Sequence, residues 1–147
     1  MQSRRSPRLP DWEYARAAAT FVTFCTHDRG HVLGIVKDDE VLLNHLGRLC
    51  VAALDSIPEH ANASVDCSIV MPDHVHAILL ARDDGVDVRA IVGSVKAQVS
   101  RNARIAGLWQ RSFYDHVVRN DADLDRVREY IATNPMRWTI ARHDPYP

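Results

Sequence analysis

Hydrophobic residues recur along this chain with two spacings, one typical of β-strands and one typical of α-helices. Residues 20–26 alternate β-branched and aromatic residues, which predicts a strand. Residues 40–57 place apolar residues on one helical stripe, and Pro58 is expected to end that helix. By the same reasoning we expect further strands at residues 64–70, 74–81 and 112–119, and further helices at residues 88–105 and 121–134.

The order of these elements indicates an α+β fold. The short connection at residues 71–73 favours an antiparallel hairpin between the second and third strands. The first six elements then predict a ferredoxin-like, split βαβ arrangement, which is an antiparallel sheet with two helices on one face. A C-terminal helix that carries Tyr130 is an addition to it. We expect one domain at residues 20–138, between a basic N-terminal arm at 1–19 and a C-terminal tail at 139–147.

Length and composition narrow the class of protein. The chain has 147 residues, of which 46% are hydrophobic and 25% charged, as in ordinary globular proteins. No apolar run reaches the roughly 18 residues that span a bilayer, and no apolar core follows the basic start, so we expect neither a membrane span nor a secretion signal. The three cysteines are scattered and form no CxxC pair, which argues against a zinc ribbon or a disulfide framework and leaves the cytoplasm as the default location.

Charge is unevenly distributed, although the net charge is only −1. Between residues 86 and 119 the chain has an excess of four positive charges, and the N-terminal arm adds more arginines. The stretch from residue 28 to residue 66 is acidic instead. A segregated basic surface suits phosphate binding whatever the total charge, although such clusters are more often solvated faces.

The third predicted strand contains a pair of histidines, His74 and His76. Alternate side chains of a strand point to the same face, so these imidazoles lie about 6.5–7 Å apart at their Cα atoms. Their neighbours in the strand are nearly all apolar, and polar rings in such surroundings need partners. A shared metal ion is one partner, and separate hydrogen bonds are the alternative.

A second candidate group lies on the last predicted helix. Tyr130 and Asn134 are four residues apart and would share a helix face. A tyrosine is usually a packing residue, but it becomes a nucleophile where a nearby cation or base helps to remove its proton. The amide oxygen of Asn134 is a suitable hard ligand for Mg²⁺ or Mn²⁺ beside two imidazoles, leaving positions open for a phosphate.

Three motifs together resemble those of the single-tyrosine HUH transposases, and most closely the REP-associated tyrosine transposases. They are VMPDHVH at residues 70–76, LWQRSFYDH at residues 108–116 and YIATNP at residues 130–135. The start at residues 4–10 and the stretch at residues 21–26 are also similar, so the resemblance covers nearly the whole chain in order. Asp73 stands where many members have Asn, which adds a charge beside the expected metal site.

The resemblance implies a DNA strand-cleaving and strand-joining activity. His74 and His76 would hold a divalent metal, Mg²⁺ or Mn²⁺, and Asn134 would complete its site. Tyr130 would attack a phosphate of single-stranded DNA and leave a 5′-phosphotyrosine link and a free 3′-hydroxyl. The resemblance implies hairpin or palindromic repeats as targets, and either a monomer or a homodimer. The sequence leaves open whether His116 or Asp115 faces the metal, and structural polar residues are the favoured interpretation of both.

Several residues are candidates for contacting DNA. The basic candidates for backbone contacts are Arg4, Arg5, Lys96, Arg101 and Arg104. Trp109 is a candidate for stacking on an unpaired base, as are Phe113 and Tyr114, although core packing is the more common role for such aromatics.

Two other functions remain open. The first is a catalytically idle relative that binds DNA hairpins and forms no adduct. The second is a metal-dependent hydrolase in which Tyr130 has no role, but this would need more ligands than the chain obviously supplies.

Overall fold

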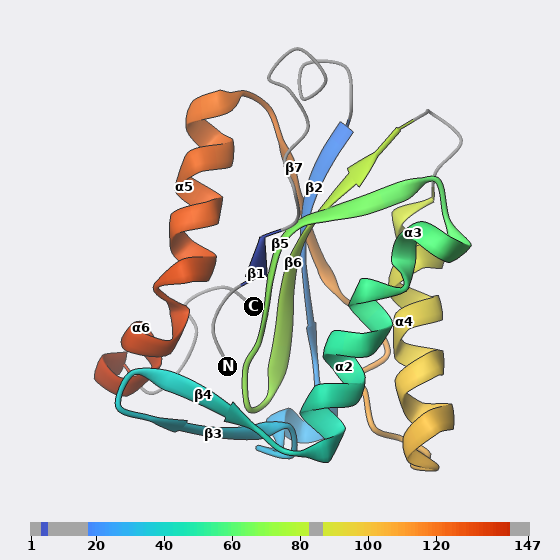
Figure 1. Cartoon of the computed structure of the whole chain (residues 1–147), viewed down its shortest axis with the longest axis vertical. Helices are drawn as coiled ribbons and strands as arrows, with labels where there is room; N and C mark the ends of the chain where they lie inside the picture. The colour runs from blue at the N-terminus through green and yellow to red at the C-terminus, as the bar shows by residue number, and fades with distance from the viewer. Residues whose placement is uncertain (1–3, 6–17, 83–86, 142–147) are drawn as a thin grey trace.

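An antiparallel sheet of five strands lies at the centre of the protein (Figure 1). The computed structural model describes residues 4–5, 18–82 and 87–141. The strands lie in the order β1 (Arg4–Arg5), β5 (Ala63–Val70), β6 (His74–Ala81), β2 (Ala18–Cys25) and β7 (Tyr114–Val118). The strand that carries both histidines, β6, is therefore covered along both edges, by β5 and by β2.

The strand order confirms the ferredoxin-like prediction. Strands β5 and β6 form the expected antiparallel hairpin. Helix α2 (His45–Asp55) connects β2 to β5, and helix α4 (Val88–Ala103) connects β6 to β7. The first and third of the four predicted strands, β2 and β6, are neighbours at the centre of the sheet, as a split βαβ topology requires.

Each face of the sheet has its own hydrophobic core. Helices α2 and α4 pack on one face, where Val22, Val75 and Leu79 point toward them. Helix α5 (Asp121–Ala132) packs on the other face, against Phe21 and Ile78 (Figure 1). The last predicted helix therefore lies on the face opposite the two ferredoxin-like helices.

The predicted helix at residues 40–57 is wrong at its start. Residues Glu40–Leu43 form strand β4, which pairs with β3 (Gly34–Lys37) across a turn at Asp38 and Asp39. Both turn residues have left-handed backbone angles, with φ of 53° and 61°, which is the geometry of a two-residue hairpin turn. The apolar residues of this segment alternate between buried and exposed, and that fits a strand as well as a helix over so short a stretch.

Helix α2 begins only at His45, where the side chain of Asn44 accepts a hydrogen bond of 3.0 Å from the backbone N–H of Gly47. It ends at Asp55. Helix α3 (Ile57–His60) follows as a separate turn with Pro58 in its first positions. The helical stripe that the sequence showed thus extends over two helices rather than one.

The predicted helix at residues 121–134 also ends earlier than expected. Helix α5 stops at Ala132, and helix α6 (Asn134–Ala141) begins directly after Thr133. Pro135 acts here as a residue of the first helical turn, a position where its missing N–H costs nothing. Helix α6 continues beyond residue 138, and strand β2 begins at Ala18, whereas residues 1–3, 6–17 and 142–147 lie outside the described residues.

None of the helices in the described part of the chain has the length and hydrophobicity that crossing a bilayer requires.

Candidate active site

The two histidines lie side by side on the face of β6 that helix α5 covers. The ring centroids of His74 and His76 are 4.5 Å apart, and both side chains are fully buried. Val75, between them, is also fully buried but belongs to the core of the opposite face. The strand alternation expected from the sequence therefore places both imidazoles together.

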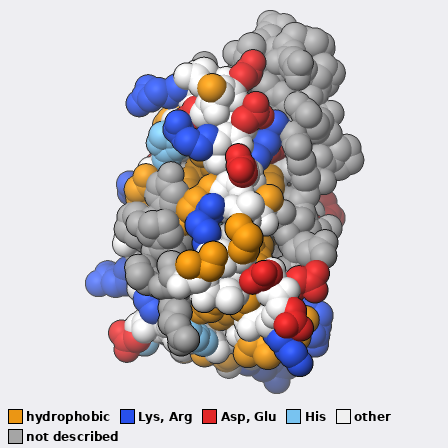
Figure 2. All heavy atoms as spheres, turned by 90° about the vertical axis from the view of Figure 1, so that its left-hand side faces the viewer, with side chains coloured by type: hydrophobic (Ala, Val, Ile, Leu, Met, Phe, Trp, Pro, Cys, Tyr) orange, Lys and Arg blue, Asp and Glu red, His pale blue; other side chains and the backbone are white. Residues whose placement is uncertain are grey.

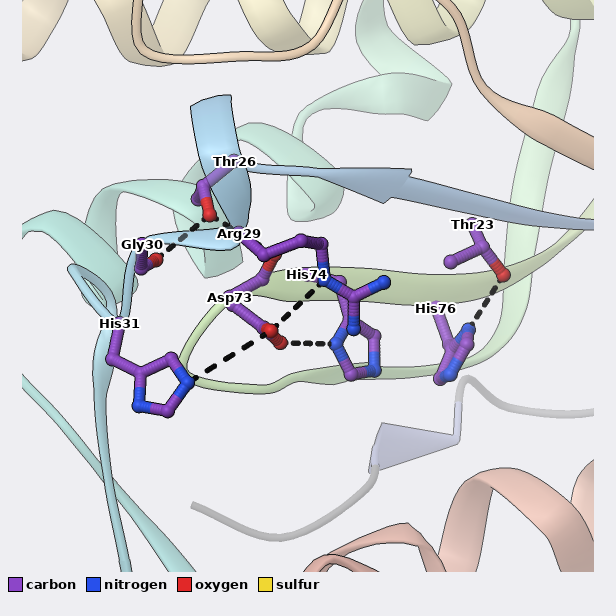
Figure 3. Close-up of polar contacts among 8 residues, drawn as sticks. All are labelled: Thr23, Thr26, Arg29, Gly30, His31, Asp73, His74 and His76. Carbon is purple, nitrogen blue, oxygen red and sulfur yellow. Dashed lines mark hydrogen bonds and ion pairs between the residues drawn. The ribbon is translucent and has the colours of Figure 1, made fainter. Parts of the chain in front are cut away.

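Each imidazole is held through its Nδ1 atom (Figure 3). Nδ1 of His76 lies 2.7 Å from the hydroxyl oxygen of Thr23, its cross-strand partner on β2. Nδ1 of His74 lies 2.6 Å from Oδ1 of Asp73. Metal-binding histidines commonly engage one ring nitrogen in this way, and Nε2 is then the nitrogen that coordinates the ion.

The carboxylate of Asp73 is the most strongly held charge at this site. The Nε atom of Arg29 donates a hydrogen bond of 2.9 Å to Oδ2, and Nε2 of His31 lies 4.0 Å from the same oxygen. Burial alone would raise the pKa of Asp73, but the hydrogen bonds and charges of His74 and Arg29 outweigh it, and the pKa lies below its usual value. The group is therefore ionised at neutral pH.

Tyr130 lies in the last turn of α5 and contacts the histidine pair. Its ring centroid is 5.4 Å from that of His76 and 6.2 Å from that of Phe21. The guanidinium of Arg137 lies over the ring, 4.2 Å from its centroid, and also donates a hydrogen bond to the backbone carbonyl of Tyr130. The tyrosine and the histidines, predicted from separate motifs, are thus neighbours in the fold.

Asn134 is the first residue of α6 and is 3% exposed. It does not share one continuous helix with Tyr130, because the chain leaves α5 at Thr133. Four residues further on, the ring centroid of Trp138 lies 6.2 Å from that of His74 and 5.1 Å from that of His31. Helix α6 therefore covers the histidine pair. Its role as a third ligand stays a prediction.

The donor set fits a divalent metal, although it is short of charged ligands. Two imidazoles share one face, and each has its Nδ1 atom engaged, which fixes the orientation of both rings. Within the described residues, no group of three or more His, Cys, Asp or Glu could hold a metal ion. A site here would depend on His74, His76 and oxygen donors such as an amide or a phosphate.

His116 and Asp115 take separate positions on β7. His116 faces the same side of the sheet as His76, but its Nε2 atom lies 2.9 Å from Oδ2 of Asp123, near the start of α5. Asp115 faces the opposite side, where it lines a groove between α4 and β7. His116 thus has a partner near the start of α5, and Asp115 lies on the face of the sheet opposite the histidine pair.

The residues predicted to contact DNA differ in how exposed they are and in what they already contact. The Nζ atom of Lys96 donates to the backbone carbonyls of Gln110 and Ser112, at 2.9 and 3.0 Å, and burial lowers the pKa of this lysine. Trp109 packs edge-on against Phe24, with ring centroids 5.2 Å apart, which is a core position. Arg101 and Arg104 are exposed at the C-terminal end of α4, whereas the side chains of Arg4 and Arg5 lie outside the described residues.

The groove beside α4 has a volume of about 700 Å³ and contains several basic residues. Its lining includes Arg89, Lys96 and Arg111 beside the aromatic ring of Phe113. On the opposite face, charged side chains of both signs are interspersed over α5 (Figure 2). Most basic residues of the stretch 86–119 thus lie on or beside α4, where Asp87 and Asp115 also line the groove.

Several residues of this site had no signal in the sequence. Thr23 is a neighbour of His76 only through the register of β2 and β6. Arg29 reaches Asp73 from a turn 44 positions away. Arg137 follows Tyr130 by seven positions, a helical spacing that could have been noticed, but the break between α5 and α6 changes the geometry.

Comparison with known proteins supports the resemblance found in the motifs. No protein-family model matches the chain. A Haemophilus influenzae protein provisionally named a REP-associated tyrosine transposase is 30% identical over 95 residues, which cover 54% of this chain and 53% of that protein. The Escherichia coli REP-associated tyrosine transposase is 26% identical over 73 residues, which cover 50% of this chain and 44% of that protein. The matched segments thus span about half the length of these two relatives.

A solved structure extends the likeness to the fold. It shows a REP-associated tyrosine transposase bound to a REP hairpin, and it matches with a TM-score of 0.68 at 19% identity, covering 91% of this chain and 73% of that one. The resemblance predicted from the motifs is therefore confirmed, and the chain is related in sequence and in fold to the REP-associated tyrosine transposases.

Proposed function

We propose that this protein is a metal-dependent transposase that cleaves and rejoins single-stranded DNA through a covalent link to Tyr130. The observation that supports the proposal most directly is the contact between Tyr130 and His76, whose rings are 5.4 Å apart although the residues belong to different motifs. The contact brings the proposed nucleophile next to two imidazoles whose orientations are held by Thr23 and Asp73.

In the proposed reaction, the phenolic oxygen of Tyr130 attacks the phosphorus of the scissile phosphodiester. The bond from phosphorus to the 3′-oxygen breaks, which leaves a 5′-phosphotyrosine link and a 3′-hydroxyl. The phenol loses a proton and the leaving 3′-oxygen gains one. Because one phosphodiester replaces another, the bond energy is retained and no nucleotide cofactor is needed. A 3′-hydroxyl of another strand can later attack the same phosphorus and release the tyrosine.

Arg137 is the group best placed to assist the nucleophile. Its guanidinium lies over the Tyr130 ring, where a positive charge favours the negative charge that develops on the phenol. Arginine is not a base, so solvent or the substrate must accept the proton. This residue supplies the nearby cation that a tyrosine nucleophile requires.

A divalent metal, Mg²⁺ or Mn²⁺, would be held by His74 and His76, with Asn134 as the proposed third ligand. When bound, it would act as a Lewis acid on the phosphate and stabilise charge that builds up in the transition state. For this, the phosphate must reach the site that His74 and His76 form beside Tyr130. Both imidazoles are fully buried here, so DNA must displace the groups that cover them, including Trp138.

We further propose single-stranded or hairpin DNA as the partner, contacted by the basic side of the molecule. The groove beside α4 brings Arg89 and Arg111 together with Phe113, a combination suited to a phosphate backbone and an unpaired base. Arg101 and Arg104 extend this exposed basic surface along α4. The cytoplasm is the compartment in which such a protein would meet its DNA, and either a monomer or a homodimer is compatible with the proposal.

The test is a covalent-adduct assay on denaturing gels. Labelled hairpin oligonucleotides with single-stranded flanks are incubated with the protein and Mn²⁺ or Mg²⁺. We expect a metal-dependent shifted band that disappears in Tyr130→Phe and in the His74→Ala/His76→Ala double variant. Tyr114→Phe is the matched control, because this tyrosine also packs edge-on against Phe21 but belongs to β7.

Two results would change the proposal. Cleavage that survives Tyr130→Phe would show that the tyrosine is not the nucleophile and would favour a metal-dependent hydrolase. Hairpin binding without any adduct, in either metal and with every hairpin tried, would favour the catalytically idle relative.

A further inference from the structure

Three side chains in a row, Arg29, Asp73 and His74, form a connected chain that ends at the proposed metal site (Figure 3). Arg29 donates to one carboxylate oxygen of Asp73, over 2.9 Å, and the other oxygen lies 2.6 Å from Nδ1 of His74. Because an ionised carboxylate can only accept, Nδ1 of His74 must be the donor. In the neutral imidazole, this fixes the tautomer whose Nε2 atom has the lone pair.

The backbone of Asp73 is held as firmly as its side chain. Its carbonyl oxygen accepts a hydrogen bond of 2.9 Å from the backbone N–H of Thr26 and lies 3.1 Å from the hydroxyl of the same residue. Asp73 is 4% exposed, and it is the last residue of the three-residue connection between β5 and β6. The carboxylate can therefore change position only by rotating about its own side-chain bonds.

The turn that supplies Arg29 adopts an unfavourable backbone conformation. Asp28 and Arg29 both have φ of 54°, in the left-handed region that residues other than glycine, Asn and Asp rarely occupy. Asp28 is largely exposed and contacts only its neighbour His27 among the interactions described, whereas Arg29 reaches the buried carboxylate. Strain of this kind is typical of positions where function requires one geometry.

We infer that Asp73 and Arg29 are positioning residues for the metal site: Asp73 orients His74 so that Nε2 faces the metal, and Arg29 holds the carboxylate in the plane that this requires. The inference rests on the proposed metal-dependent function. It also assigns a second effect to Asp73. The ligands proposed for the metal are all neutral, and this carboxylate adds a negative charge through the imidazole, which strengthens metal binding.

The first experiment uses metal-free protein, so it does not depend on the proposed activity. Long-range ¹H–¹⁵N spectra at pH 8.5, where an ordinary imidazole is neutral, report which nitrogen of His74 has the proton. We expect Nδ1–H in the wild type. Asp73→Asn should keep it, because an amide oxygen can also accept, and Asp73→Ala should lose it. A proton on Nε2 in the wild type, or an unchanged tautomer in Asp73→Ala, would overturn the inference.

Arg29 is tested by a pair of glycine variants at neighbouring positions that share a φ of 54°. Arg29→Gly removes the guanidinium, and Asp28→Gly, at the same φ, leaves it in place. We expect the Nδ1–H signal of His74 to be lost through exchange with water in Arg29→Gly and retained in Asp28→Gly. Equal behaviour of the two variants would exclude a positioning role for Arg29.

The second experiment measures Mn²⁺ affinity by calorimetry, with the His74→Ala/His76→Ala double variant as the reference without a site. We expect Asp73→Asn to bind Mn²⁺ about 10–100-fold more weakly than the wild type, the usual effect of removing such an outer partner. Affinity equal to the wild type would refute the charge effect. A wild type that binds no better than the double variant would refute the metal-dependent function, and the tautomer result would then decide the positioning role alone.

Discussion

A buried ion pair between Asp66 and Arg128 fixes helix α5 to strand β5, and its removal gives the sharpest prediction for the fold. The Nε and Nη2 atoms of Arg128 donate to the two oxygens of Asp66, at 2.8 and 2.7 Å. The two residues are 1% and 8% exposed, so neither charge has water as an alternative partner. Replacing Asp66 by Ala removes both short hydrogen bonds of the buried Arg128 guanidinium and leaves beside it the exposed carboxylate of Asp125, at 3.6 Å.

The magnitude follows from the cost of a buried charge that loses its buried partner. Removing one partner of a buried pair typically destabilises a protein by about 3–5 kcal/mol. In a domain of this size, 1 kcal/mol shifts the melting temperature by about 2–4 °C, so Asp66→Ala should lower it by about 6–20 °C. The double replacement Asp66→Leu/Arg128→Met removes both charges and keeps similar volume, and we expect stability close to that of the wild type.

Thermal and urea unfolding of the wild type, Asp66→Leu, Arg128→Met and the Asp66→Leu/Arg128→Met double variant would measure this as a double-mutant cycle, with Asp66→Ala measured beside them. We expect a double variant that is much more stable than either single variant. If Asp66→Ala loses less than about 1 kcal/mol, the pair behaves as a solvent-exposed salt bridge, and the reasoning from burial is wrong. A double variant as unstable as the single ones would show that the geometry, and not the charge balance, holds α5 in place.

Three further predictions concern stability and reactivity. Gly47→Ala should destabilise the protein by about 1–3 kcal/mol, because an added Cβ would lie 2.2 Å from a backbone carbonyl oxygen, whereas Gly93→Ala, with no atom within 4 Å, should stabilise it by about 0.5–1 kcal/mol; urea unfolding compares the two helical glycines. Burial alone would raise the pKa of Asp123, but the hydrogen bond with His116 and nearby charges outweigh burial and lower this pKa. The ionised carboxylate therefore stabilises the fold fully above the unfolded-state pKa, and this stabilisation is lost as the pH falls through the folded-state pKa. Unfolding curves from pH 7 to pH 3 should therefore show the gap between wild type and Asp123→Asn closing at acid pH, and a constant gap would contradict this. Burial raises the pKa of Cys50 to about 12, so this thiol should react with a thiol-specific reagent at pH 8 only after denaturation, and rapid labelling of Cys50 in the native protein would contradict that.

The sequence predicted the sheet well because its central strands have strong local patterns. Residues 74–81 form a strand as expected, and the alternation within it places both imidazoles on one face. The β3–β4 hairpin was missed because four residues of Glu40–Leu43 are too few to separate a strand from the first turn of a helix. The Asp38–Asp39 turn also lacks the Asn-Gly or Asp-Gly pair that usually marks such a hairpin.

Contacts between distant segments, within the candidate site and beside it, could not be predicted in the same way, since they depend on how those segments are brought together. Nothing near Asp66 in the sequence indicates its partner Arg128, which follows it by 62 positions. A register shift between Val65 and Cys67 in the β5–β6 pairing leaves Asp66 as the extra residue of a bulge, and such a residue changes which side chains face the helix. A pattern of hydrophobic residues has no means of showing this irregularity.

The same irregularity matters for the proposed chemistry. The histidines lie on a strand with neighbours on both edges, so their positions are among the most rigid in the protein. Tyr130 lies in the last turn of a helix that ends two residues later, where backbone hydrogen bonds are fewest. The Asp66–Arg128 pair is only two residues before Tyr130, and it ties that end of α5 to the strand next to the histidines. This gives the buried ion pair a role even if apolar residues would stabilise the protein equally well. Its two hydrogen bonds define where the helix lies more strictly than apolar packing alone does.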